Sequence, residues 1–290
     1  MKLEFLGSGG NSPIPTPTCR CEVCAEARTE GVPYARHGNS MYLHDLNALI
    51  DAPEYAFSSL NRAGIDRLEY VFLTHWHPDH VNGLRVVQSR DLRSFFRNPD
   101  RGLLDAASED RPTLVTTRAV YERTCETLGS LRHFVEAAGF ADTHFLDEEP
   151  LSVGDYEVSA IPYPLEDADT EPDATAFVIE SGGRTLLIAS DDARYLDESR
   201  LPGADLAVFE CGLFEALPDG TPLLTDADRS FLADELRHEE VIERIERVDP
   251  ERAVLTEIEH LYARGADEYA RLEADYDSIR FAYDGLVVEL

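Results

Sequence analysis

A short run of histidines with an aspartate stands out at residues 74–80, which read Thr-His-Trp-His-Pro-Asp-His. Three imidazoles and one carboxylate within six residues offer the nitrogen and oxygen donors that divalent transition metals bind. A strand-to-helix turn can direct His75 and His77 at one ion, and Asp79 and His80 at a second. Two neighbouring ions can activate water for hydrolysis. The run therefore predicts a two-metal hydrolase; the alternative is a solvated polar loop in which Asp79 caps a helix.

Three of the five cysteines form a second compact cluster, at Cys19, Cys21 and Cys24. Spacings this short close poor disulfide loops, whereas neighbouring thiolates suit a metal ion. Cys125 and Cys211 stand apart, and we interpret them as buried apolar thiols. The cluster therefore predicts a metal site rather than a disulfide.

Strands and helices alternate around these motifs, and the polar residues follow strand-like runs. Residues 70–73 lead into the histidine run, and residues 185–189 lead into Ser190 and Asp191. Pro78 and Asp79 stand where a helix would begin. Further strands are expected at residues 3–6, 156–161, 176–179, 206–209 and 253–258, and a strand or a hairpin at 41–50. Helices are expected at 119–139 and 234–248, and a hairpin at 279–290. Strands followed by helices in both halves are compatible with two sheets covered by helices, in one domain over residues 1–290.

The net charge of −31, from 57 acidic and 26 basic residues, is the most unusual feature of the composition. Lys2 is the only lysine, and the acidic residues are spread along the whole chain. Such a surface repels itself unless salt screens it, and the composition resembles that of proteins from extreme halophiles. The charge also argues against a nucleic-acid partner. Without a recognisable signal peptide or an apolar run of roughly 18 residues, we expect a cytoplasmic protein with no membrane partner.

The spacing His-x-His-x-Asp-His resembles the signature of the metallo-β-lactamase superfamily. The resemblance implies an α/β fold, an αββα four-layer sandwich of two mixed sheets flanked by helices. It also implies two divalent metal ions, manganese or zinc, at the active site, with Asp79 binding metal and orienting the nucleophile. In the family, an aspartate at the end of a strand bridges the two ions, and Asp191 matches it. Asp192 is the weaker candidate for that role.

A narrower resemblance is to the phosphoribosyl 1,2-cyclic phosphate phosphodiesterases of the carbon–phosphorus lyase pathway. That family begins with a strand, a glycine-rich turn and a Cys-x-Cys-x-x-Cys run, as this chain does around Gly7–Gly10. The resemblance implies a catalytic role for His238, which by itself on an acidic helix would be interpreted as a surface residue. It further implies one structural zinc, with the ligands Cys19, Cys21, Cys24 and His260.

Two metal-binding histidines of that family are absent from this chain. The acidic pair Glu166 and Asp167 follows the strand-like residues 158–164, and Glu257 follows Thr256. Because carboxylates also coordinate divalent cations, we expect Asp167 to complete one ligand set and Glu257 the other. The competing interpretation is that these carboxylates belong to the acidic surface and point into solvent.

Together these residues predict hydrolysis of a small cyclic phosphodiester by a metal-activated hydroxide, with His238 assisting at the transition state or the leaving oxygen. One alternative is a ribonuclease Z-like nuclease, against which stand the cysteine run and the lack of a basic RNA-binding arm. A second alternative is a non-catalytic protein of this fold that keeps metal for binding or assembly. The sequence leaves a homodimer open.

Overall fold

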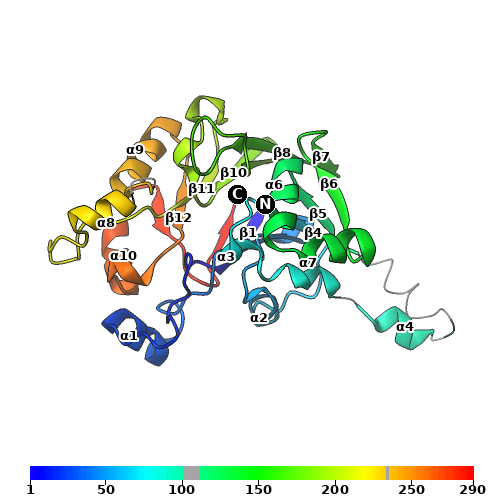
Figure 1. Cartoon of the computed structure of the whole chain (residues 1–290), viewed down its shortest axis with the longest axis horizontal. Helices are drawn as coiled ribbons and strands as arrows, with labels where there is room; N and C mark the ends of the chain where they lie inside the picture. The colour runs from blue at the N-terminus through cyan, green and yellow to red at the C-terminus, as the bar shows by residue number, and fades with distance from the viewer. Residues whose placement is uncertain (90, 99, 101–110, 233–234) are drawn as a thin grey trace.

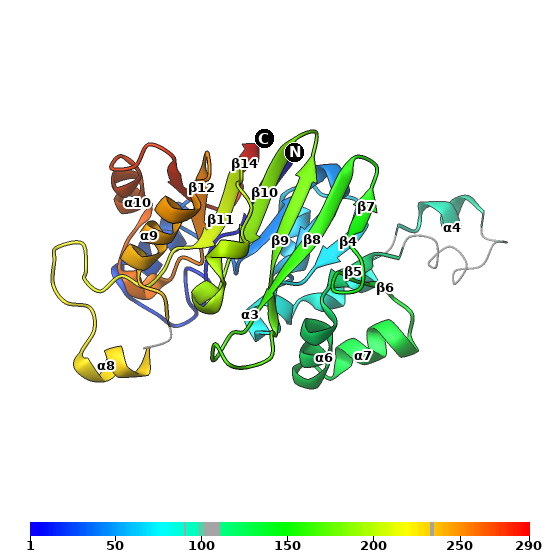
Figure 2. The ribbon, with the colours of Figure 1, turned by 90° about the horizontal axis from the view of Figure 1, so that it is seen from above.

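A computed structural model describes residues 1–89, 91–98, 100, 111–232 and 235–290, and these residues form two seven-stranded sheets (Figure 1, Figure 2). The first sheet has the order β14 (Val287–Glu289), β1 (Lys2–Gly7), β2 (Ser40–Leu43), β3 (Ala48–Ile50), β4 (Tyr70–Phe72), β5 (Thr113–Thr116) and β6 (Asp142–Phe145). It is antiparallel from β14 to β3 and parallel from β3 to β6.

The second sheet has the order β13 (Ile279–Phe281), β12 (Ala253–Thr256), β11 (Leu206–Glu210), β10 (Arg184–Ala189), β9 (Ala174–Ser181), β8 (Tyr156–Tyr163) and β7 (Leu151–Val153). Its strands are parallel from β10 to β13 and antiparallel from β7 to β10. Both sheets are therefore mixed, and each has a parallel half whose strands end at a common edge.

Apolar side chains that alternate along the strands hold the two sheets together. In β9, Phe177 and Ile179 face the first sheet, whereas Ala176 and Val178 face the helices on the other side. The Phe177 ring lies 5.3 Å from the ring of Phe72 in β4 and joins the sheets at their centre. Burial of these large side chains is the main favourable contribution to this packing.

Helices cover the outer face of each sheet, as the two views show (Figure 1, Figure 2). Leu60 of α2 (Ala56–Arg62) and Val120 of α6 (Arg118–Thr127) pack on the first sheet. Val241 of α9 (His238–Val248) and Tyr269 of α10 (Ala266–Glu273) pack on the second. The predicted αββα four-layer sandwich is confirmed. The other α-helices among the described residues are α1 (Glu22–Glu30), α3 (Pro78–Val81), α4 (Arg93–Arg97), α7 (Ser130–Arg132) and α8 (Asp226–Phe231).

Several predicted elements differ from the structure. The hairpin at residues 279–290 is wrong, because β13 pairs with β12 in one sheet and β14 pairs with β1 in the other. The helix expected at 119–139 divides into α6, α7 and a π-helical turn at His133–Ala137. The amphipathic helix near residue 234 begins only at His238. None of the described helices is long and apolar enough to cross a membrane.

Candidate metal centre

The histidine run continues β4 and then turns into a helix, as its spacing predicts. The backbone carbonyl of Thr74 accepts a hydrogen bond from the amide of Thr175 at 2.8 Å, and His75 forms a bridge with Ala174. This pairing with β9 keeps the run extended. Pro78 then occupies the first turn of α3, where its missing N–H has no helical partner to lose. His75 and His77 therefore project from extended chain, whereas Asp79 and His80 project from α3.

One group of side chains that could hold a metal ion consists of His75, His77, Asp191 and Asp192, whose donor atoms all lie within 4.8 Å of one another. His77 Nδ1 is 2.8 Å from Asp192 Oδ2. His75 Nε2 is 3.6 Å from Oδ2 of each aspartate. Two imidazoles and two carboxylates around one point are a donor set suited to a divalent ion.

A second group, held within the same 4.8 Å limit, consists of Asp79, His80, Asp191 and Glu257. His80 Nε2 lies 2.9 Å from Asp191 Oδ2, 3.6 Å from Asp79 Oδ2 and 3.7 Å from Glu257 Oε1. Asp191 belongs to both groups and stands where a bridging ligand would. The structure thus brings together six predicted residues from three distant parts of the chain, and Glu257 faces the site rather than solvent.

The burial of the donors shows that these groups fit metal ions. His75 Nε2 and Glu257 Oε1 are buried without a hydrogen-bond partner. Burial lowers the pKa of His75 well below its usual value, and the neighbouring His80 and His77 lower it further, so the ring is neutral. Its Nδ1 can donate to Thr74 Oγ1 at 3.0 Å, which leaves the lone pair on Nε2. An unpartnered lone pair aimed at carboxylates is what a metal ion would satisfy.

Asp51, which our sequence reasoning missed, orients two of the candidate ligands, His80 directly and His75 through Thr74. It is fully buried at the end of β3, and its carboxylate accepts hydrogen bonds from the amide and hydroxyl of Thr74 at 2.9 and 2.7 Å. It also lies 2.9 Å from His80 Nδ1. Holding a proton on Nδ1 of His80 leaves Nε2 for metal. A carboxylate directly after a strand was the available signal, but many acidic residues in this chain share it.

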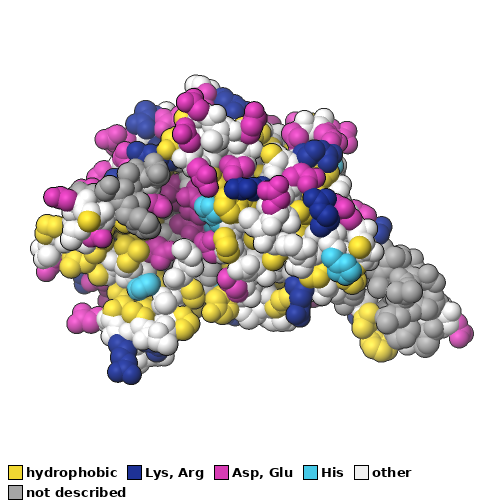
Figure 3. Space-filling model, viewed as in Figure 1, with side chains coloured by type: hydrophobic (Ala, Val, Ile, Leu, Met, Phe, Trp, Pro, Cys, Tyr) yellow, Lys and Arg dark blue, Asp and Glu magenta, His cyan; other side chains and the backbone are white. Residues whose placement is uncertain are grey.

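Negative charge is concentrated at the centre. Burial raises the pKa of Asp191 to about 7, and the adjacent Asp192 adds to this rise. Burial and then Asp191 raise the pKa of Glu257 well above its usual range. Figure 3 shows acidic side chains lining a hollow on this face of the molecule, with histidine beside them. Cations bound among these carboxylates would relieve their mutual repulsion.

The structure does not bring the expected Asp167 into the first group, and Asp192 lies there instead. Asp167 is exposed in the β8–β9 loop, where its carboxylate accepts a hydrogen bond from the amide of Asp169 at 3.0 Å, and the neighbouring Glu166 is also exposed. Its own turn therefore satisfies the Asp167 side chain. Asp192 reaches the site because its backbone is left-handed, with φ 47° and ψ 36°. This turn directs a second carboxylate toward the histidines directly after Asp191.

His238 is buried rather than on the surface, but its contacts are aromatic. Its ring stacks on Phe214 with centroids 4.2 Å apart, and Nδ1 lies 2.8 Å from the carbonyl oxygen of Cys211. Burial lowers the pKa of His238, and Nε2 has no hydrogen-bond partner. His238 belongs to neither donor group. Its catalytic role therefore remains a prediction carried by the family resemblance alone.

The three clustered cysteines come together as predicted, with sulfur atoms within 4.8 Å of one another. Burial raises the pKa of Cys24 to about 11, so a thiolate there needs a nearby cation. His260, the expected fourth ligand, is outside this group. Its Nδ1 lies 3.0 Å from Thr16 Oγ1, and the amide of Thr16 donates to Cys24 Sγ at 3.4 Å. In this structure Thr16 thus links His260 to the cluster.

The glycine-rich turn after β1 brings the N-terminal chain close to the second donor group. Gly9 forms bridges with Gly38 and Ile258. A methyl group on Gly10 would lie 2.4 Å from Glu259 Oε1 and 3.0 Å from Glu257 Oε2. Burial raises the pKa of Glu259 to about 7, although the amides of Ser12 and Asn11 oppose the rise by hydrogen bonding. The turn therefore leaves room for two glutamates, which agrees with a packing role for Gly10.

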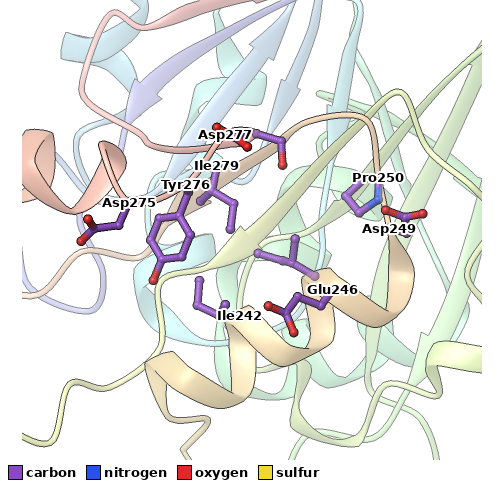
Figure 4. A pocket seen from close by; sticks show the side chains of 10 residues that line it. Ile242, Glu246, Asp249, Pro250, Asp275, Tyr276, Asp277 and Ile279 are labelled. Atoms are coloured by element: carbon purple, nitrogen blue, oxygen red, sulfur yellow. The ribbon is translucent and has the colours of Figure 1, made fainter.

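A separate cavity of about 250 Å³ lies beside α9, between that helix and the chain leading into β13 (Figure 4). Glu246, Asp249 and Asp275 lie around this cavity without converging on one point, and no residue of either donor group lines it. The cavity is therefore not an extension of the metal centre.

The chain thus combines a four-layer αββα sandwich with two adjoining groups of side chains that could hold metal ions. Residues 46–258 match the Beta-lactamase superfamily domain, and the chain therefore belongs to the beta-lactamase superfamily, with the metallo-β-lactamase fold.

Similar proteins cover most or all of the chain. Coenzyme PQQ synthesis protein B of Methylobacterium radiotolerans is 26% identical over 236 residues, which are 72% of each chain. The structure of Zn(2+)-bound PqqB from Methylobacterium extorquens matches with a TM-score of 0.69 at 19% identity and covers 100% of both chains. A diphosphatase from the PhnP family matches with a TM-score of 0.66 at 19% identity, over 100% of this chain and 97% of that one. At these identities the structural matches establish the fold.

Proposed function

We propose that this protein is a metal-dependent hydrolase that cleaves a small cyclic phosphodiester at a two-ion centre. The observation that supports this most directly is Asp191, whose carboxylate belongs to two donor groups at once. A shared carboxylate places two ions close enough to act on one substrate. Seven residues complete this arrangement: His75, His77, Asp79, His80, Asp191, Asp192 and Glu257.

Divalent ions bound here would supply an acidified water molecule and neutralise charge on the substrate oxygens. The protein's part is to hold the donors in place before the reaction. Asp51 and Thr74 fix the ring orientations of His80 and His75. Asp79, whose Oδ2 lies 3.6 Å from His80 Nε2, would accept a hydrogen bond from the attacking water and so orient it.

The charge of the ligand set favours a substrate with one negative charge. Four carboxylates among the donors, those of Asp79, Asp191, Asp192 and Glu257, would balance the charge of two divalent ions. A centre with three additional neutral imidazoles and no excess positive charge attracts a dianionic phosphate monoester weakly. A phosphodiester carries a single charge, and a small cyclic ester fits an acidic hollow better than a polyanionic nucleic acid does.

The donor set also favours manganese. Four of the seven donor residues are carboxylates and three are imidazoles. Hard oxygen ligands suit manganese or magnesium, whereas imidazole and thiolate suit zinc. We therefore assign manganese to the active-site pair and a structural zinc to the cysteine cluster.

The test begins with chelator-treated protein reloaded with manganese or zinc in molar potassium chloride, with metal content measured alongside activity. We expect two ions beyond the cysteine-bound zinc, and hydrolysis of a 2′,3′-cyclic nucleotide and of bis(p-nitrophenyl) phosphate that exceeds hydrolysis of p-nitrophenyl phosphate. Asp191→Asn should lose both the ions and the activity. Asp167→Asn is the matched control, because its exposed side chain lies outside both groups, and it should behave as the wild type. A protein that binds two ions but cleaves no diester would contradict the proposal.

A further inference from the structure

The backbone that carries Asp191 and Asp192 is held by buried side chains from three different elements. Tyr163 of β8 donates its hydroxyl hydrogen to the carbonyl oxygen of Asp191 at 2.9 Å. Glu210, at the end of β11, accepts a hydrogen bond from the amide of Ala193 at 2.8 Å. Arg244 of α9 donates to the carbonyl oxygens of Ala193 and, at 3.3 Å, of Arg194. These three side chains are between 2% and 5% exposed.

We propose that Glu210 and Arg244 are positioning residues that hold the turn after Asp191 so that Asp192 serves as a metal ligand beside His75 and His77. This inference rests on the two-ion centre of the proposed function. It gives a role to a buried glutamate and a buried arginine that the reaction itself does not use.

The turn needs such support because of its geometry. Successive residues of a strand point to opposite faces, so two neighbouring aspartates cannot both reach one centre from extended chain. Here the chain bends at Asp192, which adopts φ 47° and ψ 36°. This left-handed conformation is strained for a residue other than glycine and persists only where its surroundings enforce it. The result is that Asp191 lies 2.9 Å from His80 and Asp192 lies 2.8 Å from His77.

The hydrogen bonds of Arg244 fit a positioning role rather than substrate binding. Its Nε donates to Glu198 Oε1 at 2.9 Å, and its two other nitrogens donate to the backbone of Ala193 and Arg194. Glu198 also accepts two hydrogen bonds from Arg247, at 2.7 and 2.8 Å. The guanidinium of Arg244 is therefore occupied on all sides. Glu210 likewise belongs to neither metal-binding group.

The experiment measures manganese binding by calorimetry on chelator-treated protein, without reference to activity. The wild type should bind two ions in separable steps. Glu210→Leu and Arg244→Leu should each weaken one step by about 10–100-fold, the usual loss when a residue that orients a metal ligand is removed, and leave the other nearly unchanged. Glu210→Gln keeps an oxygen that can accept from Ala193 and should restore most of the affinity. Arg247→Leu is the control, because Arg247 contacts Glu198 but not the turn.

The outcomes separate this inference from the proposed function. If the wild-type protein binds no pair of ions, both the proposed function and the positioning role are wrong. A wild type that binds two ions, with Glu210→Leu binding both equally well, overturns only the positioning role. If Glu210→Gln is as damaging as Glu210→Leu, Glu210 acts through its charge and the inference is again overturned. If the leucine variants fail to fold, Arg244→Lys tests the positioning role, because a lysine cannot reach the carbonyl oxygens of both Ala193 and Arg194. Unchanged manganese binding in Arg244→Lys would contradict that role.

Discussion

Substituting Gly10 by alanine should weaken metal binding much more than it weakens folding. The added methyl carbon would lie 2.4 Å from Glu259 Oε1 and 3.0 Å from Glu257 Oε2, whereas ordinary contact begins near 3.4 Å. Glu259 must therefore move by about 1 Å and Glu257 by about 0.4 Å. Metal–ligand distances tolerate only about ±0.2 Å, so the smaller shift already displaces Glu257 from a bound ion.

The cost to folding is small because both contacts are with the ends of long side chains. We expect about 1 kcal/mol, the lower end of the range for added methyl groups in packed regions. For a domain of this size that lowers the melting temperature by about 2–4 °C. The ion in the group of Asp79, His80, Asp191 and Glu257 should bind about tenfold more weakly.

The assay compares Gly10→Ala with Gly203→Ala by manganese calorimetry and thermal unfolding of the metal-free protein. Gly203 has no heavy atom within 4 Å of an added methyl group and no positive φ, so alanine there should leave metal binding unchanged. Equal metal affinity in Gly10→Ala and wild type would refute the reasoning, since it would mean that Glu257 is not a ligand or that it has room to move aside.

Four further predictions follow from the site and the charge. Glu257→His replaces an oxygen donor by a nitrogen donor and should shift the metal preference from manganese toward zinc. The measurement is the ratio of bound manganese to bound zinc in a competition. An unchanged ratio would mean that Glu257 is not a metal ligand. Cys21→Ser should lose about one zinc and melt at a lower temperature than Cys125→Ser, whose thiol lies outside the cluster; equal zinc contents would contradict the assignment. Because the net charge is −31, the melting temperature should rise between dilute buffer and molar potassium chloride, and a flat response would refute the halophile interpretation. Hydrogen bonds from Arg247 and Arg244 outweigh burial and lower the pKa of Glu198 from its usual 4.5 to about 2. The ionised Glu198 therefore stabilises the fold above pH 4.5, and this stabilisation is lost as the pH falls toward 2. Glu198→Gln should flatten that part of the acid-unfolding curve.

Much of the metal centre could be predicted because its signals are local. Three histidines close to one aspartate need no distant partner to be recognised, and the strand before them consists of apolar and aromatic residues. Asp191 and Glu257 were assigned through the family resemblance, and the structure shows that each follows a buried strand in the parallel half of one sheet. Pairing between distant strands was harder to predict. The contact of β14 with β1 joins Lys2 to Glu289 and leaves no local pattern, so these last residues were mistaken for a hairpin.

The carboxylates that the sequence reasoning missed share a physical cause. Among 57 acidic residues, an aspartate or glutamate after a strand is common, and its type alone does not distinguish a ligand from a surface residue. In the structure, Asp51 and Asp192, which the sequence reasoning did not assign to a ligand set, both have positive φ, at 55° and 47°. Strained residues of this kind gather where the surrounding structure enforces them. Asp167 lacks such enforcement, because its exposed loop lets it hydrogen-bond to the amide of Asp169. The conformation of Asp192 is enforced, because Glu210 hydrogen-bonds to the amide and Arg244 to the carbonyl of the next residue, Ala193. These contacts depend on tertiary packing, which residue type and spacing do not reveal.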